Sequence, residues 1–334
     1  MRKLIFILFI IYLLPASYAQ DAFRVMFYNV ENFFDIKDDP ETNDNDFLPE
    51  GKKHWTSSKM DEKKNSISKV IAAVGEGTPP AIVGLAEVEN DYVLKLLTKY
   101  SPLKKWKYNY VHFNSPDPRG IDVALLYDTQ QFSLISSINI PIQFPSGKNT
   151  RDVLYVSGKT SFGDTLHVFV CHTPSRIGGK TQTEYKRMRA LSVVKQHCDS
   201  IFSISPNANI IIMGDFNDTP SDKSLSVSLG AKSLVEPYKA SCLYNMFYQF
   251  VDNPFLGTHK YQSQWSVLDQ IIVSGNLLIS GVVKPSSAYI FRAEFLLEED
   301  KRNMNVRPKR TYNGLKYNGG YSDHLPVVII LKDA

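Results

Sequence analysis

Cysteine is scarce in this sequence, which has three in 334 residues, at positions 171, 198 and 242. So few cysteines exclude a dense disulfide framework and a zinc site of four thiolates, and any bound metal is expected on oxygen and imidazole ligands. Neither charge is in large excess, because 38 Lys and Arg face 34 Asp and Glu. This mild basicity permits a polyanionic partner without arguing for one. With 43% hydrophobic and 22% charged residues, the composition excludes a disordered, collagen-like or membrane-embedded chain.

Residues 1–19 have the pattern of a cleavable signal peptide. Arg2 and Lys3 precede an apolar run over residues 4–14, and small residues follow up to Ala19. The run is shorter than the roughly 20 residues that span a bilayer, so we favour cleavage after Ala19 over a membrane anchor. We therefore expect a secreted or periplasmic protein. In an oxidising compartment at least one of the three thiols has no partner within a monomer, and the spacing does not decide whether the other two join.

Short apolar runs alternate with amphipathic segments along residues 20–334. We expect sheet strands at residues 23–28, 81–86, 121–127, 165–172, 209–213, 267–273 and 326–331. We expect helices at residues 57–74, 91–100 and 183–202. The sequence contains no internal repeat and no long Pro, Ser or Gly linker, so a single domain over residues 20–334 is the better interpretation. Residues 300–318, rich in Lys, Arg and Asn, are expected to form a long mobile surface loop.

Polar side chains cluster at the ends of the expected strands, where an α/β fold usually places its site. The set contains four carboxylates, two amides and two imidazoles. Its members are Asn29, Glu87, His172, Asp215, Asn217, Asp269, Asp323 and His324.

This set of groups suits the hydrolysis of a phosphate ester. Mg²⁺ binds one or two carboxylates together with waters and phosphate oxygens, and Glu87 and Asp323 can supply the carboxylates. An imidazole can move a proton near neutral pH, and Asp269 could fix the tautomer of His324. The amides of Asn29 and Asn217 can hydrogen-bond a phosphate or a water without adding negative charge.

Each of these motifs also has a plain structural interpretation. Gly-Asp-Phe-Asn-Asp at 214–218 is a good exit from a strand into a turn, and Ser-Asp-His at 322–324 could be an exposed corner. The joint occurrence of the motifs favours function. Trp55, Trp106 and Trp265 are expected to pack in the core or at its rim, and paired lysines and arginines are expected to be solvated surface. No dense basic stripe that could follow a phosphate backbone is present.

Together the motifs resemble those of the endonuclease/exonuclease/phosphatase superfamily, the group with the deoxyribonuclease-I-like fold. The resemblance covers nearly all of residues 20–334. It rests on Tyr-Asn-Val-Glu-Asn at 28–32, Leu-Ala-Glu-Val-Glu-Asn at 85–90, Arg-Gly-Ile-Asp-Val-Ala-Leu-Leu-Tyr at 119–127, Cys-His-Thr-Pro-Ser-Arg at 171–176, Gly-Asp-Phe-Asn-Asp at 214–218, Leu-Asp-Gln-Ile-Ile at 268–272 and Ser-Asp-His-Leu-Pro at 322–326. It implies a four-layered α/β/β/α sandwich of two mostly antiparallel mixed sheets with outer helices.

The resemblance also implies roles for single residues. Glu87 would be the principal metal ligand, with Asn29 and Asp323 on the same side, for Mg²⁺ or alternatively Mn²⁺ or Ca²⁺. Asp215 and Asn217 would hold the scissile phosphate and the attacking water. The pair of His324 and Asp269 would act as the general base or stabilise the transition state. Asp215 would be the competing candidate for the base. His172 would act as the acid or contact the phosphate.

Arg119, Asp122 and Arg176 match less widely shared positions, and an arginine there could bind phosphate through two hydrogen bonds. At Cys171 the sequence departs from the many relatives that have asparagine, which removes an expected support for His172.

The sequence thus predicts a secreted, metal-dependent phosphoesterase that works as a monomer without stable membrane insertion. A nuclease acting on nucleic acid is the first choice. The alternative is a phosphatase or phosphodiesterase for inositol phosphates, sphingomyelin-type lipids or other small phosphoesters. A non-catalytic binding protein of the same fold is a third interpretation, disfavoured because a degenerate site should lack at least one ligand. Specificity would depend on loops at residues 37–55 and 300–317.

Overall fold

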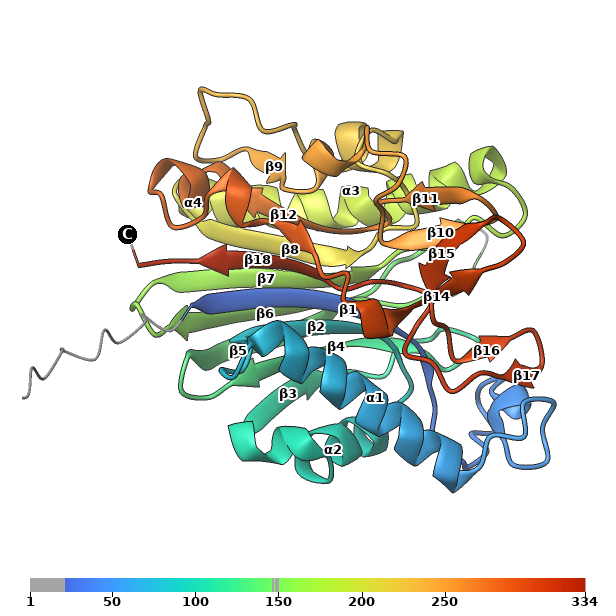
Figure 1. The fold of residues 1–334 in the computed structure, drawn as a ribbon. Coiled ribbons are helices and arrows are strands. Elements are labelled where there is room, and N and C mark those ends of the chain that lie inside the picture. The colour runs from blue at the N-terminus through green and yellow to red at the C-terminus, as the bar shows by residue number, and fades with distance from the viewer. Residues whose placement is uncertain (1–21, 146, 148–149, 334) are drawn as a thin grey trace, which may run out of the picture.

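A computed structural model describes residues 22–145, 147 and 150–333, and two six-stranded sheets form its centre (Figure 1). The first sheet has the strand order β13 (Tyr289–Ile290), β18 (Val327–Leu331), β1 (Phe23–Phe33), β2 (Ile82–Val88), β4 (Asp122–Asp128) and β3 (Tyr108–His112). The second has the order β5 (Phe132–Ile140), β6 (Val153–Thr160), β7 (Thr165–His172), β8 (Asn209–Asp215), β12 (Asp269–Ser274) and β9 (Leu243–Asn245).

Helices cover the outer faces of the two sheets. Figure 1 shows α1 (Ser57–Gly75) and α2 (Asp91–Lys99) outside the first sheet and α3 (Lys180–Ile204) outside the second, with the short α4 (Gly275–Ile279) at the end of β12. The remaining strands of the described residues form three two-stranded hairpins: β10 (His259–Tyr261) with β11 (Gln264–Ser266), β14 (Leu297–Asp300) with β15 (Asn305–Pro308), and β16 (Tyr312–Asn313) with β17 (Lys316–Tyr317). Short helical turns are η1 (Asn45–Phe47), η2 (Pro102–Trp106), η3 (Ser224–Leu229), η4 (Tyr248–Phe250), η5 (Pro285–Ser287) and η6 (Glu294–Leu296).

The central strands of both sheets are buried on both faces, which explains their continuous apolar sequence. Along β8, Ile211 and Met213 face the first sheet, while Ile210 and Ile212 pack against α3. This alternation follows from the two-residue period of a strand. The expected four-layered α/β/β/α sandwich of mostly antiparallel mixed sheets is therefore confirmed.

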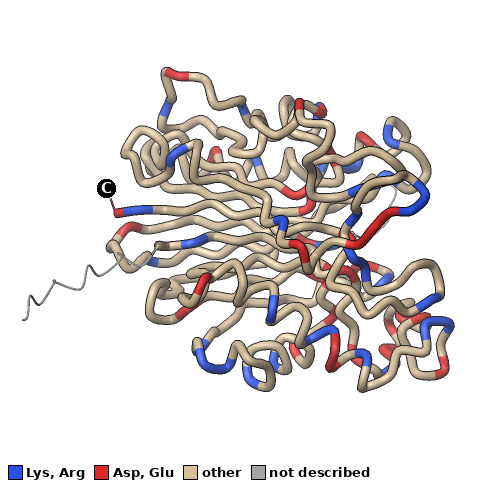
Figure 2. Tube along the Cα trace, viewed as in Figure 1, with Lys and Arg blue, Asp and Glu red and all other residues tan. Residues whose placement is uncertain are grey.

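Each sheet contains one parallel pair of strands, and the two pairs fix the place where the polar residues collect. Strands β1 and β2 run parallel in the first sheet, and β7 and β8 run parallel in the second. The carboxyl ends of these strands lie at the right-hand side of Figure 1, beside the hairpins β10–β11 and β14–β15. Figure 2 shows that charged residues of both signs gather on this side, whereas the middles of the strands are nearly free of charge.

The seven strands and three long helices expected from the sequence correspond to β1, β2, β4, β7, β8, β12 and β18 and to α1, α2 and α3. The expectation for residues 300–318 is wrong, because this segment forms β15, β16 and β17 and the turn from β14. Strand β5 was not expected from the pattern; it lies at the edge of its sheet and exposes Leu134, Ile135 and Ile138, so it shows no apolar alternation.

The signal peptide at residues 1–19 lies outside the described residues and stays a prediction. Within the described part of the chain, no helix combines the length and the apolar character needed to cross a bilayer.

A buried ion pair joins α3 to the end of β8. Arg187, on the inward face of α3, is fully buried, and its Nε lies 2.7 Å from Oδ2 of Asp218, which is also fully buried. The Ser224 hydroxyl donates to the same carboxylate, at 2.7 Å. The pair therefore anchors the loop that follows Asp215.

We predict that Asp218→Asn lowers the free energy of unfolding by about 3–5 kcal/mol, because it leaves the Arg187 guanidinium buried without a counter-charge. Urea denaturation would measure this. The matched control is Asp199→Asn, which breaks the ion pair of Asp199 with Lys195 on the exposed side of α3 and should change stability by less than about 1 kcal/mol. Equal effects of the two substitutions would contradict the anchoring role.

All three cysteines are free. Burial raises the pKa of the Cys171 thiol well above its usual range and that of Cys198 to about 12. Cys242 is only partly buried. We predict that Ellman's reagent at pH 8 modifies Cys242 in the folded protein and all three thiols in denaturant, since only an accessible thiolate reacts. Rapid modification of Cys171 without denaturant would contradict this packing.

Candidate active site

The expected site residues come together where the two sheets meet. In the second sheet, His172 at the end of β7 pairs in register with Asp215 at the end of β8, and Asp269 pairs with Asp215 from the other side. In the first sheet, Asn29 in β1 lies next to the end of β2, where Glu87 follows Ala86. The fold therefore delivers side chains from five strands, β1, β2, β7, β8 and β12, to one place.

Irregular backbone at the ends of β1 and β2 directs the Glu87 side chain toward the other site residues. The register of β1 with β2 shifts between Asn29 and Phe33, and that of β2 with β4 shifts between Ala86 and Val88. Glu87 has φ of 63° and Asn32 has φ of 55°, values that non-glycine residues adopt rarely. The Asn32 N–H donates to Oε2 of Glu87, at 3.0 Å. Such bulges commonly redirect side chains next to active sites.

Five ionisable groups form a continuous series across the site. His172 Nε2 lies 3.9 Å from Glu87 Oε1 and 3.6 Å from Asp215 Oδ2. His324 Nε2 lies 3.8 Å from the same oxygen of Asp215 and 4.0 Å from Asp323 Oδ1. Glu87, His172, Asp215, His324 and Asp323 thus surround a common space.

Asp215 lies at the centre of the series and is held by two amides. Asn29 donates its Nδ2–H to Asp215 Oδ2, at 3.1 Å, and the Asn217 backbone N–H donates to Oδ1, at 2.9 Å. The Asn217 side chain is itself fixed, because its Nδ2 donates to the Thr173 carbonyl at 3.1 Å. Gly214 makes the close approach possible, since a Cβ there would lie 2.3 Å from the Cys171 carbonyl oxygen in the neighbouring strand.

The pair of His324 and Asp269 has the geometry of an oriented imidazole. Nδ1 of His324 lies 2.7 Å from Asp269 Oδ2, which leaves Nε2 facing Asp215 and Asp323. Thr258 holds Asp269 by accepting its backbone N–H, at 3.0 Å. Burial would lower the pKa of His324, but Asp269, Asp215 and Asp323 around it raise this pKa well above its usual range. The three carboxylates therefore favour the protonated form of the His324 imidazole.

His172 has the opposite electrostatic environment. Burial lowers its pKa well below the usual range, and the cations Arg151, Arg119 and His324 lower it further. Its Nδ1 is buried and makes no hydrogen bond to any described residue, which agrees with the missing support expected from Cys171. Burial raises the pKa of Asp215, with Asp269 acting in the same direction and His324 against it. The pKa values of the two imidazoles are thus shifted in opposite directions although both face the same carboxylate.

A second row of charged residues, which were not among the expected site residues, surrounds the site. Arg310 donates from Nη2 to Asp323 at 2.7 Å and from Nε to Glu31 at 3.2 Å. The buried Lys63 donates to Thr311 and to the Tyr321 carbonyl. Burial would raise the pKa of Asp323, but His324 and Arg310 hold it below its usual range. Glu31 was recognisable within the 28–32 motif, whereas Arg310 lies in the segment expected to be a mobile loop.

One other buried cation and one histidine were also not expected from the sequence. Arg151 donates from Nη1 to Asp117 at 2.8 Å and from Nη2 to the Thr173 carbonyl at 2.9 Å, beside His172. The ring centroid of His259 lies 4.7 Å from that of His324. Neither residue belongs to a motif at the end of a long apolar strand, so no pattern distinguished it.

The donor atoms present fit a divalent cation. Glu87 Oε1 and Asp323 Oδ1 accept no hydrogen bond from the described residues, whereas the second oxygen of each carboxylate is already bonded. Hard oxygen donors of this kind are what Mg²⁺ or Mn²⁺ requires. His259, Asp323 and His324 also offer ligand atoms within 4.8 Å of one another, as do Asp215, Asp269 and His324. Because Asp269 already binds the imidazole of His324, the carboxylates of Glu87 and Asp323 remain the better ligands.

The three weaker site predictions have separate positions. Arg119 is half exposed, lies 3.6 Å from Asp117, and is close enough to lower the pKa of His172. Asp122 is buried and binds His112 Nε2 at 3.0 Å and the Ser115 backbone N–H at 3.0 Å, so its carboxylate is occupied. Arg176 donates to the Asn217 carbonyl at 2.6 Å and pairs with Asp222. Of the two arginines, Arg119 is therefore the one whose guanidinium stays largely available, whereas the carboxylate of Asp122 does not.

Comparison with solved structures agrees with this architecture. The human Nocturnin catalytic domain with bound sulfate anion is 18% identical, with a TM-score of 0.54, covering 94% of this chain and 95% of that chain. An endonuclease/exonuclease/phosphatase family protein from Bacteroides thetaiotaomicron is also 18% identical, with a TM-score of 0.54 and coverage of 94% and 98%. TDP2 from D. rerio complexed with single strand DNA product is 15% identical, with a TM-score of 0.54 and coverage of 93% and 99%.

No curated protein matches the chain. The solved structures therefore show the fold, and the sequence itself shows the family. The sequence profile of the Endonuclease/Exonuclease/phosphatase family matches residues 24–333, which is nearly the whole described chain. The protein is a member of the endonuclease/exonuclease/phosphatase family.

Proposed function

We propose that this protein hydrolyses phosphodiester bonds with the help of a divalent cation, and that nucleic acid is its substrate. The observation that carries the proposal is the series from Glu87 through His172, Asp215 and His324 to Asp323, in which neighbouring groups lie within 4.0 Å. Family members are usually hydrolases of phosphoesters, which supports the reaction class. The D. rerio TDP2 structure contains a single strand DNA product, which supports the substrate class.

Glu87 and Asp323 would hold the cation, with Asn29 beside them. When bound, a divalent cation there supplies positive charge to the phosphate oxygens during the reaction. The Asn29 amide is largely committed, because its Oδ1 accepts the Glu31 backbone N–H and its Nδ2 donates to Asp215. We therefore assign Asn29 chiefly to orienting Asp215.

Proton transfer can be divided among the remaining groups. Asp215 is the better candidate for the base, because its oxygens are fixed by Asn29 and Asn217 and its raised pKa increases its basicity. The cationic His324 would stabilise the charge that develops on the phosphate oxygens. His172 would donate a hydrogen bond from Nε2 to the phosphate, since its lowered pKa favours the neutral imidazole and leaves little of the protonated form to act as an acid.

We predict that Mg²⁺ or Mn²⁺ raises the melting temperature by a few degrees, because saturation at 100 times Kd adds about 2.7 kcal/mol to stability. Glu87→Gln should remove most of this rise, since it replaces the carboxylate that best fits the cation. Differential scanning calorimetry with and without the metal measures the effect. Glu50→Gln, at an exposed glutamate, is the control and should keep the full rise. A rise that persists in Glu87→Gln would place the cation elsewhere.

The catalytic assignment is tested with purified protein on DNA, RNA, inositol phosphates and sphingomyelin in the presence of Mg²⁺ or Mn²⁺. We expect release of acid-soluble nucleotides from nucleic acid. Asp215→Asn and His324→Gln should each lower kcat by about 10²–10⁴ without loss of the folded state, because each removes a group that acts in the transition state. Unchanged activity in both variants would reject the site, and activity on inositol phosphates or sphingomyelin alone would reject nucleic acid as substrate.

A further inference from the structure

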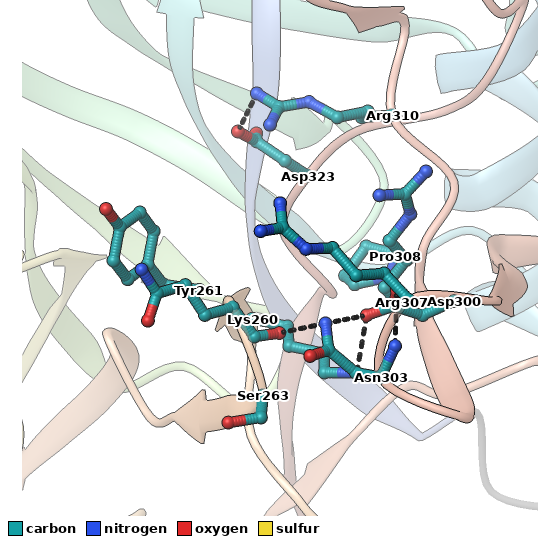
Figure 3. Close-up of a pocket in the computed structure, with 11 residues that line it drawn as sticks. Lys260, Tyr261, Ser263, Asp300, Asn303, Arg307, Pro308, Arg310 and Asp323 are labelled. Atoms are coloured by element: carbon teal, nitrogen blue, oxygen red, sulfur yellow. Dashed lines mark hydrogen bonds and ion pairs between the residues drawn. The ribbon is translucent and has the colours of Figure 1, made fainter.

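A second cavity adjoins the active site and is built from two hairpins that the catalytic chemistry does not use. Its volume is about 480 Å³, within the range of pockets that bind small ligands. Residues of β10–β11 and of β14–β15 form its walls, and Asp323 and Arg310 lie at its boundary with the active site. In Figure 3 the pair of Arg310 and Asp323 lies at the top of this pocket and the cluster of Lys260, Asp300 and Asn303 at the bottom.

The two hairpins are tied together, so the pocket has fixed walls. Lys260 is almost fully buried and donates from Nζ to Asp300 at 2.9 Å and to the Val306 carbonyl at 3.1 Å. Asn303 donates to the Gln262 carbonyl, at 3.1 Å. Strand β10 also connects directly to the catalytic region, because His259 forms a β-bridge with His324. A ligand in this pocket would therefore lie beside the catalytic groups.

The charge of the pocket favours an anion. Four of the lining residues are cations and two are carboxylates, which gives an excess of positive charge. Lys260 is balanced by Asp300, and Arg307 is paired with Glu298 at 2.8 Å. Arg302 is exposed and has no ion pair or hydrogen bond within residues 22–145, 147 and 150–333. Its guanidinium is thus available for an anionic group that enters the pocket.

The groups that remain available in the pocket suit a phosphate better than an apolar ligand. Arg310 lines the pocket and uses Nε and Nη2 for Glu31 and Asp323, so its Nη1 has no hydrogen-bond partner among the described residues. Guanidinium groups bind phosphate oxygens in pairs of hydrogen bonds. Tyr261 lines the pocket with 70% of its surface exposed, which offers an aromatic face to the group that carries the phosphate.

We infer that this pocket binds a second phosphate group of the substrate, next to the phosphate that is hydrolysed. The inference rests on the proposed function and narrows it to substrates with at least two phosphates. A neighbouring phosphate of a nucleic-acid strand and a second phosphate on a small polyol share this chemistry. Arg302 is the specificity-determining residue. Because its guanidinium would contact the second phosphate in the bound substrate as well as in the transition state, its loss should act mainly on KM.

Binding is tested first, independently of turnover. Inorganic pyrophosphate is titrated by calorimetry, without metal, into the full chain carrying Glu87→Gln, which weakens metal binding at the active site. Addition of Arg302→Gln should raise Kd about tenfold, because a charge-assisted contact is lost. Addition of Lys301→Gln is the matched control, since Lys301 is the exposed neighbour of Arg302 and does not line the pocket; Kd should not change. Equal Kd values for the three proteins, or no binding at all, would overturn the inference.

Turnover then distinguishes the source of the phosphate. The thymidine dinucleotide TpT is compared with its 5′- and 3′-phosphorylated forms, and inositol monophosphate with inositol bisphosphate. The second phosphate should raise kcat/KM about tenfold in one series, and Arg302→Gln, but not Lys301→Gln, should remove this advantage. Turnover without any such advantage overturns the pocket assignment. If no substrate is turned over but Arg302→Gln still weakens the binding of pyrophosphate, the proposed function is rejected and the anion-binding site is retained.

Discussion

One hydrogen bond between the two sheets is the contact on which the active site depends. Asn29 belongs to the first sheet and Asp215 to the second, and the bond from Asn29 Nδ2 to Asp215 Oδ2 joins them at the carboxyl ends of their strands. Both residues are almost completely buried. A buried carboxylate needs such donors, because its transfer from water is otherwise costly. The bond therefore fixes the relative position of the sheets at the place where their polar residues face one another.

The ionisable groups around this bond shift one another's pKa values in a way that would not be expected if they served only the stability of the fold. Asp215, Asp269 and Asp323 are close together, and their proximity raises the pKa of His324 while burial and nearby cations lower that of His172. Perturbed pKa values in opposite directions are typical of catalytic sites, where environment assigns different roles to similar residues. The strained backbone at Glu87 and Asn217 belongs to the same region, and strain of this kind is often found where function requires a particular side-chain direction.

Much of this arrangement could be predicted from the sequence because the central strands are buried on both faces and end in polar motifs. Residues such as Ile211 and Met213 give an apolar pattern that a single sequence reveals, and Asp215 follows directly. Edge strand β5 could not be recognised, since its exposed Ile135 and Ile138 follow no burial pattern. Arg302 and Arg310 could not be recognised either, because Arg302 lies in the turn of the short hairpin β14–β15 and Arg310 lies between that hairpin and β16–β17. Side-chain contacts such as that of Lys260 with Asp300 hold this region in place. Tertiary contacts of this kind leave no period in the sequence.

The most direct test of this account is anomalous diffraction from crystals of the full chain soaked with Mn²⁺ and inorganic phosphate. We predict a manganese peak in contact with the Glu87 carboxylate and close to Asp323, and a phosphate on the side of Asp215, His172 and His324. A manganese peak that has no contact with Glu87, with the phosphate away from both histidines, would contradict the conclusion that these residues form one catalytic centre.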